Sequence, residues 1–143
     1  MIEPSAAAGL AWTRLLRAQR VALAKVEGAL KDAGLPPLAW CDVLLELERA
    51  KPGALRPFEL QNRLLLAQYN LSRLVARIAK AGYLEQRPCD DDGRGQELVL
   101  TPAGRAARRR MWAVYGPAIQ AAVGDRLTAR EAEVLATLLG KLA

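Results

Sequence analysis

The apolar pattern of the chain changes its period at Gly82, and this change restricts the fold more than any other feature. Before Gly82, apolar residues recur at the spacing i, i+3, i+4, i+7, which predicts a helix over residues 67–81 with one buried face. After it, residues 84–87 and 97–100 are short strand candidates on either side of a polar loop that contains glycine. The chain must therefore contain a helix that leads directly into a β-hairpin. The residues expected to face inward from this helix are Leu71, Leu74, Val75 and Ile78.

The rest of the chain carries helical periodicity and clear helix start signals. Thr101-Pro102 supplies an N-cap and a first-turn proline, and Thr128 with Glu131 forms a capping box. Gly116-Pro117 is expected to bend the helix that contains it. The sequence thus predicts a mainly α fold (α+β) with six helices and one small β-hairpin. The expected helices cover residues 7–32, 37–49, 57–64, 67–81, 101–123 and a last segment that follows Thr128.

The net charge of +6 is concentrated in the middle of the chain. Residues 56–110 carry eleven Lys and Arg against six Asp and Glu, whereas residues 111–143 carry three of each. A basic middle between nearly neutral ends favours a module that binds a polyanion. On charge alone, a solvated basic face without a partner is an equally good interpretation.

Residue types that are absent or rare exclude several classes of function. The chain has no histidine, which removes Ser-His-Asp and Cys-His catalysis and imidazole metal ligands. No catalytic residue, metal site or cofactor is therefore expected. Two cysteines are too few for a disulfide framework, so Cys41 is expected to be an inert core thiol and Cys89 an exposed loop thiol, with a redox switch at Cys89 as the alternative.

No stretch approaches the ~18 uncharged apolar residues of a membrane span, and no signal peptide is recognisable, which together predict a cytoplasmic protein with no membrane partner.

The element order predicts a winged helix-turn-helix: a short helix, a tight connection, a second helix and a hairpin with a charged tip. A helix of about 15 residues fits the major groove of double-stranded DNA, which is about 12 Å wide. The N-terminal part of such a helix meets the bases. The alternative is an ordinary amphipathic helix with a hydrated basic face. The DNA-binding candidates are, for base contacts, Gln68, Tyr69, Asn70 and Arg73 and, for phosphate or wing contacts, Ser72, Arg77, Lys80 and Arg87.

Arg94 lies at the expected hairpin tip between two glycines, Gly93 and Gly95. Glycine on each side removes bulk and lets the backbone approach DNA closely, and an arginine on a slim tip suits a narrow, electronegative minor groove. Asp92 is expected to orient Arg94 by a charge-assisted hydrogen bond. A solvated loop arginine is the alternative interpretation.

Five short segments match one known pattern when they are read in order. They are residues 59–60 (EL), 72–78 (SRLVARI), 80–88 (KAGYLEQRP), 92–94 (DGR) and 98–104 (LVLTPAG). Together they resemble the MarR family of bacterial transcription regulators, whose order of six helices and one wing is similar as well. The resemblance implies an obligate dimer, DNA binding by the helix at residues 67–81, and a wing in which Asp92 and Arg94 act together. The chain departs from the family at residues 64–67 (LLLA), where a glycine and a Ser, Thr or Asp cap are usual.

Both ends of the chain carry apolar stripes that a small winged lobe does not cover. Pairing of two chains about a two-fold axis would bury them, and the resemblance implies that the first, fifth and sixth helices form this interface. The alternative is that both stripes pack within the monomer. A dimer would space two recognition helices about 34 Å apart, which predicts a pseudo-palindromic operator. The expected division is residues 1–34 for dimerisation, 35–100 for DNA binding and 101–143 for dimerisation.

Four aromatic residues are candidates for a ligand pocket. Proteins similar to this one often bind a small aromatic or phenolic effector between the dimer lobe and the winged lobe. The residues on the matching helices are Trp12, Trp40, Trp112 and Tyr115. Aromatic residues at helical spacing are also typical of a core, which is the alternative.

The function favoured by the sequence is a sequence-specific, DNA-binding transcriptional regulator that acts as a homodimer. We expect a repressor that a small aromatic ligand releases from its operator. A winged-helix protein-interaction module without DNA readout is the runner-up, and the two differ in the salt dependence of DNA binding.

Overall fold

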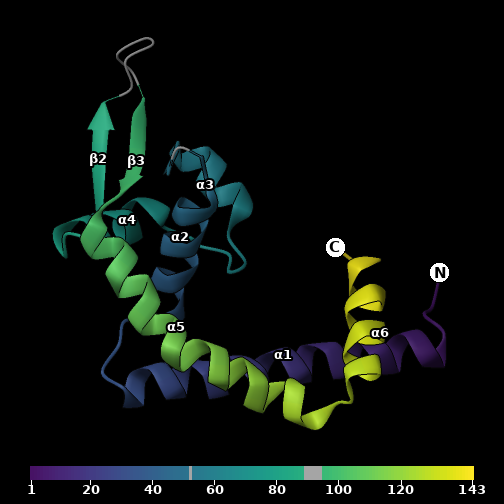
Figure 1. Ribbon diagram of the computed structural model, residues 1–143. Coiled ribbons are helices and arrows are strands. Elements are labelled where there is room, and N and C mark those ends of the chain that lie inside the picture. Colours follow the sequence, from purple (N-terminus) through teal and green to yellow (C-terminus); the bar gives the residue numbers. More distant parts are fainter. Residues whose placement is uncertain (52, 89–94) are drawn as a thin grey trace. The chain divides into compact units, whose positions relative to one another are not determined.

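The computed structural model describes residues 1–51, 53–88 and 95–143 (Figure 1). The described residues form six α-helices and a small antiparallel sheet, which confirms the predicted fold class. No helix in these ranges is both long and apolar enough to cross a membrane. The elements are α1 (Ala6–Asp32), α2 (Leu38–Arg49), β1 (Ala54–Leu55), α3 (Pro57–Arg63), α4 (Leu71–Lys80), β2 (Leu84–Pro88), β3 (Gln96–Leu100), α5 (Pro102–Ala122), the 3-10 turn η1 (Gly124–Arg126) and α6 (Ala129–Gly140).

The chain divides into two compact units. The first combines Met1–Ala33 with Val114–Ala143 and holds α1, the end of α5 and α6. The second, Gly34–Ala113, holds α2 to β3 and the start of α5. Helix α5 therefore supplies residues to both units, and Pro117 lies inside this one continuous helix.

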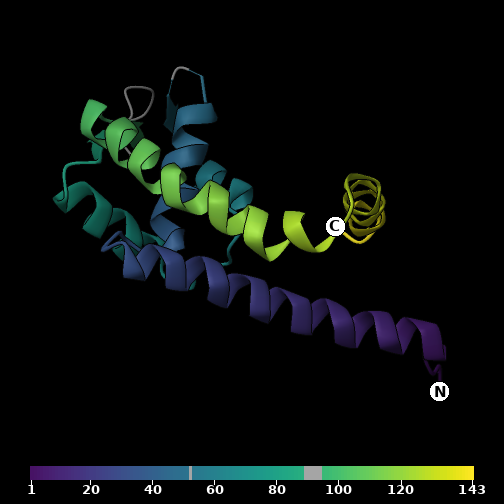
Figure 2. The same ribbon diagram turned by 60° about the horizontal axis from the view of Figure 1, so that its bottom comes forward.

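The second unit is built around the sheet, whose strand order is β1-β3-β2. Its hairpin pairs Leu84 with Leu100 and Pro88 with Gln96, so each predicted strand is one residue longer on the loop side. Helix α2 lies against α3, β1 and β3, while α4 lies against β2 (Figures 1 and 2). Sequence reasoning missed β1, which pairs antiparallel with β3 through Ala54 and Leu55.

The core of the second unit consists of the apolar faces that the periodicity predicts. All four inward residues expected for α4 are buried, and they pack with side chains of α2, α3 and the sheet. Burial of such side chains supplies about 1.5–3 kcal/mol each. The residues with the least exposure in this cluster are Val43, Leu44, Leu47, Leu60, Ile78 and Leu98.

The start of α4 corrects one prediction. The sequence predicts a helix from residue 67, but α4 begins at Leu71, and residues 64–70 form a connection without regular structure. The physical reason is capping. The side chain of Asn70 accepts a hydrogen bond from the backbone N–H of Arg73, with 3.2 Å between Oδ1 and N. Such a cap satisfies a backbone donor that an uncapped helix start leaves without a partner.

Cys41 lies in the core with no solvent exposure, which confirms the predicted core thiol. Burial raises the pKa of its thiol to about 11; the nearby charge of Arg108 lowers the pKa by a smaller amount, and that of Asp42 raises it slightly. Cys89 lies outside the described residues, so its reactivity stays a prediction.

We expect a Cys89→Ser variant to resist thiol reagents while it is folded. The reactive species is the thiolate, and a pKa of about 11 leaves few Cys41 thiols ionised at pH 8. The rate of labelling by a chromogenic disulfide reagent should rise more than about ten-fold when denaturant is added, because both ionisation and access are restored. Fast labelling of the native variant would contradict the buried position of Cys41.

Candidate nucleic-acid interface

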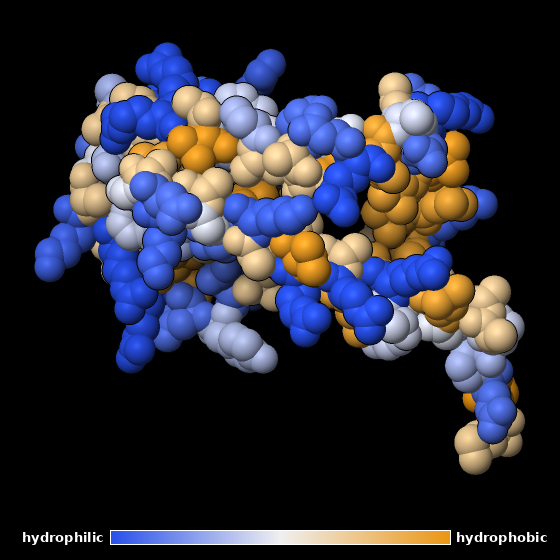
Figure 3. All heavy atoms as spheres, turned by 90° about the horizontal axis from the view of Figure 1, so that it is seen from below, coloured by the Kyte–Doolittle hydropathy of each residue, from blue (hydrophilic) through white to orange (hydrophobic). Residues whose placement is uncertain are grey.

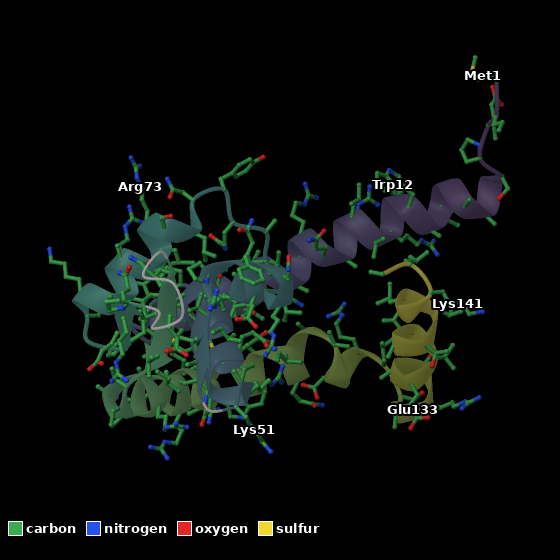
Figure 4. The ribbon with its side chains drawn as sticks, turned by 90° about the horizontal axis from the view of Figure 1, so that it is seen from above. Met1, Trp12, Lys51, Arg73, Glu133 and Lys141 are labelled. Atoms are coloured by element: carbon green, nitrogen blue, oxygen red, sulfur yellow. The ribbon has the colours of Figure 1, made fainter. Side chains whose placement is uncertain are left out.

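Helix α4 presents a basic face to solvent because its apolar face is fully used in the core. Residues at positions 71, 74, 75 and 78 are buried, whereas those between them are exposed. Arg73 points outward from the second unit (Figure 4). The predicted contact residues of this helix therefore share one exposed face, which carries Ser72, Arg73, Arg77 and Lys80.

A surface groove of about 470 Å³ brings five of the predicted contact residues together. One wall comes from the start of α2 and contains Trp40, and the other comes from the connection and from α4 as far as Arg77. Ser72, Lys80 and Arg87 do not line it. The predicted residues that line the groove are Gln68, Tyr69, Asn70, Arg73 and Arg77.

The three residues before α4 differ in what they offer to a ligand. The Asn70 side-chain oxygen is engaged in the helix cap, so Asn70 contributes to the position of α4 as well as to any contact. Tyr69 is fully exposed and Gln68 is half-buried. Because these residues lie before the first turn of α4 in a connection without regular structure, their side chains do not follow the helical spacing expected from the sequence.

Sequence reasoning missed Asp42, which lies on α2 and is 5 % exposed. One of its carboxylate oxygens, Oδ2, accepts hydrogen bonds from the backbone N–H groups of Leu65 (2.9 Å) and Leu66 (3.0 Å) in the connection. Burial raises the pKa of this carboxyl, and the two backbone hydrogen bonds oppose the increase. The only sequence signal is a charged residue next to the apolar stripe of its helix, which is weak because such positions are often hydrated.

Arg87 on β2 is paired within its own strand. Its Nε and Nη2 atoms both donate to Oε2 of Glu85, at 2.9 Å and 2.6 Å, and both side chains are about half exposed. An exposed pair of this kind contributes about 0.2–1 kcal/mol. Arg87 is therefore accessible to a polyanion, but an approaching polyanion must compete with Glu85.

The expected wing tip lies outside the described residues. Asp92 and Arg94 both fall in this segment, so the predicted partnership between them and their role in DNA binding stay predictions. The described part of the wing consists of β2 and β3, with Leu84 and Leu100 buried at its base and Leu98 buried midway along β3.

Two arginines on α5 stabilise the second unit internally. Arg108 forms an ion pair with Glu48 of α2, and its Nη2 lies 3.4 Å from Oε1 of that carboxylate. Arg105 approaches the same carboxylate at 3.9 Å. The Arg108 side chain is only 19 % exposed, and its ion pair joins α5 to α2.

The four aromatic pocket candidates belong to different units, with Trp40 and Trp112 in the second and Trp12 and Tyr115 in the first. Trp40 packs edge-on against Tyr83, with 6.1 Å between ring centroids and 76° between planes. This is a typical arrangement of aromatic side chains at the edge of a core. Trp12 and Trp112 are 64 % and 45 % exposed. The effector pocket stays a prediction.

Comparison with known proteins identifies relatives of this chain. Residues 33–95 match the model of the MarR family, and no curated protein matches the chain. Sco3205, a MarR family transcriptional regulator from Streptomyces coelicolor solved in complex with DNA, is 28 % identical with a TM-score of 0.87, over 99 % of this chain and 89 % of that one. AbsC, a MarR family transcriptional regulator from the same organism, is 20 % identical with a TM-score of 0.85, over 99 % and 95 % of the two chains. A mutant of MarR from E. coli complexed with operator DNA is 25 % identical with a TM-score of 0.78, over 91 % of each chain.

Proposed function

We propose that this protein binds operator DNA and represses transcription, because residues 33–95 match the model of the MarR family and the whole chain has the fold of a MarR family transcriptional regulator solved in complex with DNA. The observation that carries the proposal is the basic, exposed face of α4. Arg73, Arg77 and Lys80 project from it while the opposite face anchors the helix in the core. Two similar proteins are solved in complex with DNA. The proposal places the protein in the cytoplasm, where bacterial DNA is transcribed.

Salt dependence tests the proposal directly. A protein that neutralises several phosphates loses affinity steeply as salt rises, with a slope of about −0.9 per phosphate in a plot of log K against log salt. Fluorescence anisotropy on labelled genomic fragments should show tight, salt-sensitive binding, and selection of bound fragments should return one pseudo-palindromic sequence. Weak binding with a flat salt response would contradict DNA readout and favour a protein-interaction module.

We also propose a homodimer formed through the first unit. Helix α6 has no buried residue, and its apolar side chains are exposed (Figure 3). Along α1 the predicted stripe is divided: Val26 and Leu30 are buried, whereas Trp12 and Leu16 remain exposed. Two-fold pairing would remove such surfaces from water. The exposed residues on α6 are Val134, Leu135, Leu138, Leu139 and Leu142.

A charge in the α6 stripe should separate the two copies. Leu138 is 52 % exposed, so Leu138→Asp costs little in an isolated chain but buries a carboxylate in a dimer. Analytical ultracentrifugation should show a dimer for the wild type and a monomer with weakened operator binding for the variant. A wild type that sediments as a monomer would overturn the dimer, and with it the palindromic operator.

Release by a small aromatic ligand completes the proposal. A ligand can act only by binding one arrangement of the recognition helices better than another. Addition of a phenolic or aromatic carboxylate ligand should therefore weaken operator binding, at saturation, by the ratio of its affinities for the free and the DNA-bound protein. Unchanged binding across a panel of such compounds would leave the protein a repressor without this class of effector.

Removal of the negative charge beside Arg87 should strengthen DNA binding. In a Glu85→Gln variant, Arg87 loses its carboxylate partner and the wing loses one charge that repels phosphate. We expect operator affinity to rise by up to about five-fold at low salt, in keeping with the energy of an exposed ion pair. Glu133→Gln on α6 makes the same change in net charge and should leave the affinity within about two-fold. Equal effects of the two variants would show that Arg87 does not contact DNA.

A further inference from the structure

Asp42 is the one residue with a charged side chain that is buried within the described ranges, and its hydrogen bonds go to the segment that leads into α4. The carboxylate extends from α2, more than twenty positions earlier in the chain, to the N–H groups of Leu65 and Leu66. Burial of a carboxylate is costly unless hydrogen bonds replace its water. The two backbone donors supply this replacement.

The connection has few other fixed points. After Leu64, whose N–H still bonds to the Leu60 carbonyl at the end of α3, no helix or strand begins until Leu71. Leu65 is 77 % exposed, so its side chain does not anchor the segment by burial. Asp42 holds the start of the connection, and the Asn70 cap holds its end at the first turn of α4.

The hydrogen bonds between Asp42 and the connection lie next to the proposed DNA interface. The groove that collects Gln68, Tyr69 and Arg73 has its opposite wall on α2, the helix that carries Asp42. A shift of the connection relative to α2 would therefore change both the width of the groove and the point at which α4 begins.

We propose that Asp42 is a positioning residue for DNA recognition, which fixes the connection to α2 and thereby the placement of the base-contact residues at the start of α4. The inference rests on the proposed function. It predicts that loss of the carboxylate reduces operator affinity by more than its effect on folding explains. The number of phosphate contacts made by α4 should not change, so the salt dependence of binding should change little.

The experiment compares Asp42→Ala and Asp42→Asn with Val43→Ala, a control that removes buried methyl groups from the same helix. Amide hydrogen exchange of Leu65 and Leu66, followed by NMR, reports the anchor. Affinity for the operator selected with the wild type, measured well below each variant's unfolding temperature, reports its consequence. Asp42→Ala should speed exchange at both amides and lower affinity by about ten-fold or more, since two donors lose their acceptor. Asp42→Asn, whose carbonyl oxygen can still accept these hydrogen bonds, should have an operator affinity between those of the wild type and Asp42→Ala. The affinity of Val43→Ala should stay within about two-fold of the wild type.

Several results would overturn the inference. Operator binding by Asp42→Ala as tight as that of Val43→Ala would do so, and so would amide exchange at Leu65 and Leu66 as slow as in the wild type. If Asp42→Ala does not fold, Asp42→Leu, which removes both acceptor oxygens but fills the space, decides in the same way: unchanged amide exchange and affinity contradict the anchor. A wild type that binds no duplex would overturn the proposed function itself, whereas a wild type that binds while Asp42→Ala or Asp42→Leu binds equally well overturns only this inference.

Discussion

Arg73→Ala should weaken operator binding by about 10- to 100-fold and relax the preference for one base pair. Arg73 is the third residue of α4 and lies in its first turn. The N-terminal part of a DNA-reading helix is the part that meets the bases. Its backbone N–H is held by the Asn70 cap, so the origin of the side chain is fixed, while the side chain itself is exposed. Arginine donates two hydrogen bonds to O6 and N7 of guanine, and such a pair discriminates by about 1–3 kcal/mol against other bases.

The matched control is Lys80→Ala at the other end of the same helix. Lys80 is also exposed and basic, but it lies in the last turn of α4, where a phosphate contact is expected. Its loss should reduce the affinity for all sequences alike and make the salt slope shallower by about one unit. Anisotropy titrations of the operator, of single-base variants and of unrelated duplex separate the two patterns. If Arg73→Ala left the operator affinity unchanged, or lowered it for every duplex equally, the assignment of Arg73 to a base would be wrong.

Sequence reasoning predicted the elements whose signals are local. The inward face of α4 follows from four apolar residues at helical spacing, and all four are buried. The start of α5 follows from Thr101-Pro102: the Thr101 hydroxyl accepts from the N–H of Gly104 at 3.0 Å. The capping box of α6 is present with both of its hydrogen bonds between Thr128 and Glu131. In each case the interaction joins residues three or four positions apart, so the sequence alone contains both partners.

The predictions failed where the deciding partner is distant in sequence or the signal is too short. β1 is a strand of two residues that exists because β3 pairs with it, and two residues show no alternation. The connection is also fixed from a distance, because Asp42 on α2 accepts hydrogen bonds from the N–H groups of Leu65 and Leu66, which the pattern at residues 64–70 does not reveal. The N-cap was recognisable, since Asn70 directly precedes the first periodic residue of α4.

The largest loss of stability is expected from Gly104→Ala, a change of one methyl group in the first turn of α5. A Cβ at this position would collide with the carbonyl oxygen of Tyr83 and press on the side chain of Leu100. The carbonyl has little room to retreat, because it accepts a hydrogen bond from the N–H of Thr101 at 3.2 Å. The Thr101 hydroxyl in turn donates to the Gly82 carbonyl at 2.6 Å. These contacts hold the start of α5 against the turn between α4 and β2.

Overpacking of a well-packed contact costs about 1–3 kcal/mol and more where the neighbour is backbone. For a chain of this size that corresponds to a decrease in Tm of about 10 °C, which thermal unfolding followed by circular dichroism at one fixed protein concentration would measure. Gly140→Ala is the control, because a Cβ there meets open space at the end of α6 and alanine is the better helix former; its Tm should stay the same or rise.

The turn between α4 and β2 also sets the direction in which the hairpin leaves α4. Gly104→Ala should therefore weaken operator binding even at temperatures where the variant is folded. A variant that keeps the wild-type Tm would show that the start of α5 can move away from Tyr83 at little cost, which would contradict the tight packing of α5 against the turn between α4 and β2.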